Sequence, residues 1–288
     1  MEIKDIDTVG NHVTSTKQID IDSNKVNAIN AIVDSSIRSF IDGFEWRYSS
    51  EVDKPTGVIN MKKNNCFIAE LGEEFMFYSA FVRSFDSSFG NVLENMGNNI
   101  AKLNFDVRKN IDSYLLPQQS QHMDYLMAEY ENHTTPTIDD YNHFSCVLPK
   151  NIQSYKKSHV TDNYFYDAKL KKHYLIELKA GGDLDTKKAK AEKISLLQQY
   201  FLLKNSLIGT DETVQIYFAT AYNKFGEGND WKQERVKQFF ANEELLIGKD
   251  YWNFCCNSEY GFEIVFKQYQ ESAHRLKEAF ERIKKLYF

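Results

Sequence analysis

Hydrophobic and polar residues alternate most clearly in the middle of the chain. Two runs rich in aromatic and β-branched residues, 161–167 and 172–180, flank a polar segment, 168–171. Such runs predict a β-hairpin with its turn at that segment. Gly181 and Gly182 then break the pattern, and Asp185 or Thr186 can cap a helix that runs to about Leu203.

The remaining pattern predicts helices around this hairpin and one further strand. The strand is 213–221, and because it follows a long helix, we expect it to lie parallel to its neighbour. Apolar spacing predicts helices at 26–44, 65–85, 91–102, 231–242 and 263–286, a break at 83–90, and a compact turn at 245–253 anchored by Trp252. The predicted fold class is therefore α/β, a mixed central sheet flanked by helices.

Residues 104–160 have the weakest pattern. They predict loops at 114–121, through Pro117, and at 133–136, with a short helix at 123–130. We predict a single domain over 1–288, with a helical part at 1–110, a sheet core at 155–225 and a helical part at 226–288.

The hairpin register decides which side chains meet. A turn centred between Lys169 and Leu170 places Asp162 opposite Glu177, with side chains roughly 5 Å apart on one face. Lys179 follows two residues later and shares that face. Two carboxylates this close repel each other unless a cation or a shared proton compensates, and Mg²⁺ binds through one or two carboxylates and retained waters.

Two alternatives to this interpretation exist. A surface hairpin with a solvated Glu and Lys is common, although Tyr174, Ile176 and Leu178 favour a central strand. Asp167 is the other candidate for the acid that acts together with Glu177, but it lies near the turn and points to the opposite face. A register slip of one residue would weaken the choice of Asp162.

Asp162, followed after fourteen residues by Glu177-Leu178-Lys179, resembles the PD-(D/E)xK nuclease signature, with Thr161 where a proline is usual. The longer run Ile-Glu-Leu-Lys-Ala-Gly-Gly-Asp-Leu-Asp-Thr-Lys-Lys-Ala-Lys resembles type II restriction endonucleases. The resemblance implies that Asp162, Glu177 and the Leu178 carbonyl hold Mg²⁺ and that Lys179 orients or activates water. It also implies specific cleavage of double-stranded DNA to 5′-phosphates by a homodimer.

The segment before the third predicted helix, Arg-Ser-Phe-Asp-Ser-Ser-Phe-Gly, resembles one that precedes the catalytic hairpin in several restriction enzymes. There a glutamate of the helix can hold a second metal or order its water, which implies that role for Glu94. The alternative is an ordinary surface glutamate. Ser84, Ser87 and Ser88 either contact phosphate or cap the helix.

The helix after the paired glycines begins with Lys187, Lys188 and Lys190. Cations oppose the helix dipole at that end, so these lysines are expected to contact DNA phosphate or a guanine edge rather than only solvent. Asp183 and Asp185 either accept hydrogen bonds from cytosine or serve as turn and capping residues.

Composition places few restrictions on these predictions. The net charge of −6 does not favour nucleic-acid binding overall, but residues 169–193 carry eight lysines and four acids. No apolar run is long enough to span a membrane. The four cysteines match no zinc spacing, so we expect them to be buried thiols: Cys66, Cys146, Cys255 and Cys256. Together these features predict a cytoplasmic, prokaryotic protein. The alternative functions are a structure-specific repair or recombination nuclease and a non-catalytic nucleic-acid binder.

Overall fold

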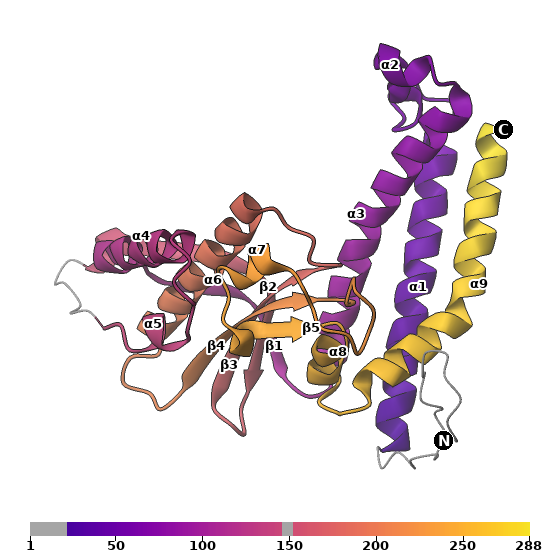
Figure 1. Ribbon diagram of the computed structural model, residues 1–288. Helices are drawn as coiled ribbons and strands as arrows, with labels where there is room; N and C mark the ends of the chain where they lie inside the picture. The colour runs from indigo at the N-terminus through magenta and orange to yellow at the C-terminus, as the bar shows by residue number, and fades with distance from the viewer. Residues whose placement is uncertain (1–21, 146–151) are drawn as a thin grey trace. The chain divides into compact units, whose positions relative to one another are not determined.

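The computed structural model describes residues 22–145 and 152–288 (Figure 1). Its contacts divide the chain into two compact units, Met1–Met96 with Ser258–Phe288, and Gly97–Asn257. The elements in chain order are α1 (Ser23–Glu51), η1 (Asn60–Asn64), α2 (Cys66–Ala69), α3 (Glu73–Ala101), β1 (Asp106–Tyr114), α4 (Pro117–Glu131), α5 (Asp139–Asn142), η2 (Ile152–Tyr155), β2 (Lys156–Asp167), β3 (Lys172–Lys179), α6 (Thr186–Ser206), β4 (Thr213–Thr220), α7 (Glu234–Lys237), η3 (Asn242–Glu244), β5 (Leu245–Ile247), α8 (Lys249–Cys256) and α9 (Gly261–Tyr287).

The second unit contains a five-stranded mixed sheet in the order β1-β2-β3-β4-β5. β1, β2 and β3 pair antiparallel, whereas β3, β4 and β5 pair parallel. Helix α6 connects β3 to β4 and packs its apolar stripe on one face of the sheet through Leu196 and Tyr200. The mixed α/β fold and the predicted parallel strand are thus confirmed.

The opposite face of the sheet is covered by α8 through one aromatic cluster. Phe254 of α8 stacks on Phe105 and contacts the rings of Phe165, Tyr174 and Tyr217 at centroid distances of 4.9 to 6.4 Å. β3 is therefore buried on both sides along most of its length, which rules out the solvated surface hairpin.

The first unit is helical, and in it the predicted break at 83–90 is wrong. Helix α3 is continuous through these residues. Phe85 and Phe89 stack on each other at 5.1 Å, and Phe85 also packs against Phe40 of α1 and Phe280 of α9. Aromatic packing on three helices outweighs the weak helix propensity of the Ser and Gly residues.

Several other predictions need correction. Pro117 begins α4 instead of lying in a loop, since proline is favoured in the first helical turn. Strand β1 was not predicted. Only α7 is α-helical within 231–242. Val236 of α7, with Phe239 and Phe240 of the turn after it, belongs to the same core cluster as residues of α6.

The compact turn predicted at 245–253 proves to be β5 and α8, with Trp252 Nε1 donating to the Ala221 carbonyl at 2.8 Å as an anchor. Cys66 is exposed rather than buried, Cys255 and Cys256 are buried, and Cys146 lies outside the described residues.

Candidate active site

The β2–β3 hairpin has the predicted register. Asn163 pairs with Ile176 and Asp167 with Lys172. Asp167 closes the turn, because its Oδ1 accepts hydrogen bonds from the backbone N–H groups of Lys169 and Leu170, at 2.8 and 3.1 Å. The alternative first acid therefore has a structural role at the far end of the hairpin.

Asp162 and Glu177 are the residues next to the pair of Asn163 and Ile176 on the two strands. The pairing of β2 with β1 shifts between Arg108 and Asn110, so this stretch of β2 lies at a bulge. Bulges often occur next to active sites, where they re-aim a side chain. The side chain of Asp162 itself is outside the described part of the chain.

Glu177 and Lys179 form the centre of the site. The Nζ of Lys179 donates to Glu177 Oε1 at 2.6 Å and lies 3.0 Å from Glu192 Oε1 of α6. Glu177 is 7% exposed, and the Lys179 side chain keeps 31% of its surface open. A lysine held between two carboxylates thus reaches solvent at the carboxyl end of a buried strand.

The electrostatics of this cluster keep Lys179 cationic. Burial acts to lower the pKa of Lys179, but the negative charges and hydrogen bonds of Glu177 and Glu192 outweigh it and raise the pKa. The ammonium group can therefore donate hydrogen bonds to an anion or a water molecule that enters beside it.

The paired glycines after Lys179 are packed against the end of β4. Gly182 has φ +66°, and a Cβ there would lie 2.6 Å from Thr220 Cγ2, so this position requires glycine. Next to it, Asp183 accepts from Lys224 at 2.9 Å and from Gln233 at 2.7 Å. The hydrogen bond from Lys224 holds the pKa of Asp183 below its usual value.

Of the two predicted caps of α6, Asp185 and Thr186, the structure has Asp185, whose Oδ1 accepts from the backbone N–H of Lys188 at 2.8 Å. The Lys188 ammonium lies 3.8 Å from Asp185 Oδ2, and Lys190 pairs with Glu131 at 2.8 Å. Lys187 is exposed. Lys188 and Lys190 thus have partners within the chain.

Glu94, Ser87 and Ser88 all lie on α3 in the first unit. Ser84 is buried and accepts a hydrogen bond from Arg47 Nη1 at 3.2 Å. Because these serines are inside a helix, none of them caps it, and that alternative is wrong. The roles suggested for Glu94, Ser87 and Ser88 in the reaction remain predictions.

The residues around Lys179 suit a hard divalent cation by their chemistry. Asp162, Glu177 and the Leu178 carbonyl offer only oxygen, as such cations require, and one or two carboxylates are sufficient. Among the side chains that the structure describes, no group of three or more His, Cys, Asp or Glu residues could hold a metal ion.

Glu192 is the site residue that the sequence analysis missed. The packing stripe of α6 contains Ala189 and Leu196, and Glu192 lies between them at helical spacing. A charged residue on an apolar stripe was the signal that could have identified it.

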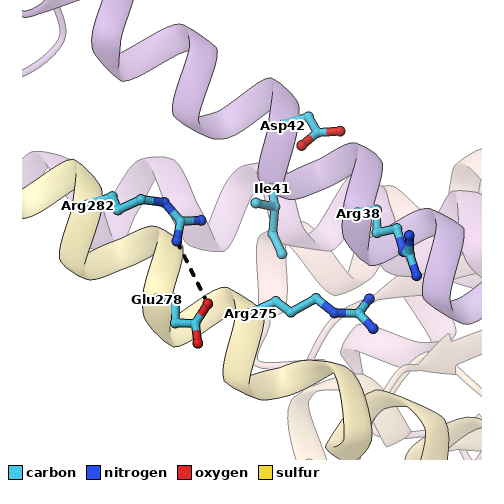
Figure 2. Close-up of a pocket in the computed structure, with 6 residues that line it drawn as sticks. All are labelled: Arg38, Ile41, Asp42, Arg275, Glu278 and Arg282. Carbon is cyan, nitrogen blue, oxygen red and sulfur yellow. Dashed lines mark ion pairs between the residues drawn. The ribbon is translucent and has the colours of Figure 1, made fainter.

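A groove between α1 and α9 in the first unit is lined by Arg38, Ile41, Asp42, Arg275, Glu278 and Arg282 (Figure 2). Its arginines are compensated within the unit. Arg38 and Arg275 both pair with Asp34, at 2.7 and 2.5 Å, and Arg282 pairs with Glu45 at 2.6 Å. We assign no site to this groove.

Within the described residues, no helix has the length and apolar character needed to cross a membrane.

Comparison with known proteins gives a match to a family over most of the chain. Neither the curated proteins nor the solved structures give a match. The family model described as "Type II restriction endonuclease, HinfI" matches residues 25–273, most of the chain. Membership implies a DNA endonuclease and, in general, the use of a divalent metal. The chain belongs to the HinfI family of type II restriction endonucleases.

Proposed function

We propose that this protein is a Mg²⁺-dependent endonuclease that cuts both strands of DNA at a short specific sequence and leaves 5′-phosphates. The observation that carries the proposal is Lys179, held 2.6 Å from Glu177 and 3.0 Å from Glu192 at the end of a buried strand. Family membership supports the reaction class, and the spacing of Asp162, Glu177 and Lys179 supports the PD-(D/E)xK arrangement.

In this proposal Asp162, Glu177 and the Leu178 carbonyl hold the metal. When bound, a divalent cation lowers the pKa of a coordinated water and offsets the charge that develops on the phosphoryl oxygens. Glu177 is almost fully buried, so its carboxylate faces little competition from bulk water.

Lys179 orients the attacking water by donating a hydrogen bond from Nζ, and Glu192 fixes the position of that ammonium group. The water oxygen bonds to phosphorus as the bond to the 3′-oxygen breaks. The water proton passes to solvent, and the leaving oxygen becomes a 3′-hydroxyl after protonation. A cation beside the phosphate is also suited to stabilise the extra charge of the transition state.

Contacts to DNA outside the reaction centre are assigned by charge and exposure. Lys187 is the best candidate for a phosphate contact, since it is exposed and precedes the partnered Lys188 and Lys190. Asp183 and Asp185 have structural partners, so in this proposal they stabilise the turn between β3 and α6 and do not contact DNA themselves. Glu94, Ser87 and Ser88 form a second proposed set, with Glu94 helping at a second metal.

We also propose a homodimer on DNA. A twofold-symmetric site is cut on both strands by two active sites related by the same symmetry, and an isologous dimer provides that arrangement. Sedimentation of the protein with and without a duplex that contains the cleavage site checks this part of the proposal.

The direct test is digestion of a sequenced plasmid with Mg²⁺, followed by mapping of the fragment ends. We expect discrete bands with 5′-phosphates and no cleavage when EDTA removes the metal. A ladder without fixed ends would contradict sequence specificity. Cleavage that continues in EDTA would contradict the metal requirement.

Lys179→Ala tests the assignment of the site. We expect cleavage to fall by about a hundredfold or more, since the group that positions the water is lost, while duplex binding in Ca²⁺ persists. Lys169→Ala, an exposed lysine of the hairpin turn, is the matched control. Equal cleavage by Lys179→Ala and the wild type would exclude this catalytic role.

A further inference from the structure

Tyr222 is an exposed aromatic residue at the edge of the candidate active site. It follows β4, and 50% of its surface is exposed. The backbone N–H groups of Ala221 and Tyr222 both donate to the carbonyl of Ala180, at 2.9 and 3.2 Å. Because Ala180 directly follows Lys179, the backbone of Tyr222 is bonded to the residue next to the proposed catalytic lysine.

The side chain of Tyr222 lies against Gly181. A Cβ added to Gly181 would overlap the Tyr222 hydroxyl and lie 2.7 Å from Cζ of the same ring. All three of the nearest atoms to that Cβ belong to Tyr222, and Gly181 has no positive φ. Glycine at this position therefore leaves the space that the tyrosine ring occupies.

The loop that carries Tyr222 is held in shape by its own hydrogen bonds. The Glu227 carboxylate accepts from the backbone N–H groups of Asn223 and Lys249, at 2.6 and 3.1 Å. Asn223 Nδ2 donates to the Asn229 carbonyl at 2.7 Å. The ring is thus presented by a backbone that needs no further ordering, which reduces the entropic cost of binding.

We infer that Tyr222 is a DNA-contacting residue, with its ring packed on the sugar–phosphate backbone next to the scissile phosphate and its hydroxyl donating to a phosphate oxygen. The inference rests on the proposed function, which places that phosphate at Lys179. Tyrosine is among the residues that fix DNA in register through phosphate and sugar contacts.

The experiment measures binding of a labelled short duplex that carries the cut site mapped by plasmid digestion, with Ca²⁺ in place of Mg²⁺. Tyr222→Ala is expected to raise Kd about tenfold, and Tyr222→Phe, which keeps the ring, by less. Tyr125→Ala, an exposed tyrosine of α4, is the matched control and is expected to bind as the wild type does.

A double-mutant cycle tests the position of the ring. Gly181→Ala must displace the Tyr222 ring, so it is expected to weaken binding to a similar degree. In Gly181→Ala/Tyr222→Ala the ring is absent and the added methyl group has space, so the double variant should bind no more weakly than Tyr222→Ala. Circular dichroism of each variant checks that the fold is retained.

Wild-type affinity in Tyr222→Ala would overturn the inference, as would a harmless Gly181→Ala or additive effects of the two substitutions. Each of these three results leaves the proposed function standing, provided that the wild type cuts the duplex. A wild type that neither binds nor cuts DNA would instead contradict the proposed function.

Discussion

The Nζ of Lys179 lies 3.0 Å from a carboxylate oxygen of Glu192, which comes from a different secondary-structure element. Lys179 ends β3, whereas Glu192 is inside α6, after the glycine turn. The second carboxylate on the lysine, Glu177, is the proposed metal ligand. Glu192 can therefore keep the ammonium group of Lys179 in position if Glu177 binds a metal ion.

We predict that Glu192→Gln lowers kcat by about ten- to hundredfold, the usual cost of removing a residue that supports a catalytic group. The amide keeps the size of the side chain but loses its charge, so Lys179 is positioned less firmly. Affinity for the duplex in Ca²⁺ should be unchanged. Glu131→Gln is the matched control, because Glu131 pairs with another lysine of α6, Lys190. Wild-type turnover in Glu192→Gln would refute this role.

A fully buried ion pair lies in the second unit. The Nζ of Lys193 contacts both oxygens of Glu244, at 2.5 and 2.7 Å, and both side chains are 0% exposed. Tyr141 Oη and the Ala241 N–H also donate to this carboxylate, at 2.7 and 2.8 Å. Removal of the carboxylate charge would leave a buried ammonium group without its counter-ion.

We therefore predict that Glu244→Gln lowers the free energy of unfolding by about 3–5 kcal/mol, measured by urea denaturation. Asp211→Asn, which breaks the exposed pair with Lys171, should have a much smaller effect, because solvent screens an exposed ion pair. Lys193→Met combined with Glu244→Gln removes the stranded charge and should recover part of the loss. Equal effects of Glu244→Gln and Asp211→Asn would show that burial of the pair is unimportant.

Sequence reasoning succeeded where the signal is local. The hairpin register follows from alternation and from a turn centred between Lys169 and Leu170, and residue type limits the cap of α6 to Asp185 or Thr186. Contacts made by packing were not predictable in this way. The sequence pattern of α6 does not reveal that Glu192 reaches Lys179, and the continuity of α3 through Phe85 and Phe89 depends on α1 and α9. β1 was missed because it is a polar strand at the sheet edge.

His173 makes stability depend on pH. Its ring is buried on β3, with Nε2 3.0 Å from Glu212 and Nδ1 2.9 Å from the Tyr164 hydroxyl. Burial lowers the pKa of His173 and outweighs the opposite effect of Glu212. As the pH falls below about 6.5, the unfolded chain binds a proton that the native histidine does not, so stability decreases.

We predict that the free energy of unfolding falls between about pH 7 and pH 5.5, and falls less in His173→Gln. Urea denaturation of both proteins across that range measures the two slopes. His274→Gln, an exposed histidine of α9, is the control and should retain the wild-type slope. Identical slopes for His173→Gln and the wild type would exclude His173 as the source.

Two glycines of α3 differ in their surroundings and should respond oppositely to alanine. A Cβ at Gly90 meets nothing within 4 Å, whereas one at Gly97 would overlap the hydroxyl of the buried Tyr251. We predict that Gly90→Ala raises the free energy of unfolding by up to about 1 kcal/mol, because alanine is the better helix former. Gly97→Ala should lower it, since Tyr251 must move in a packed interior. Urea denaturation of both variants checks the signs. In a continuous helix α3 the methyl group added at Gly90 meets no other atom and should not destabilise the protein. Destabilisation by Gly90→Ala would therefore argue against helical structure at this position.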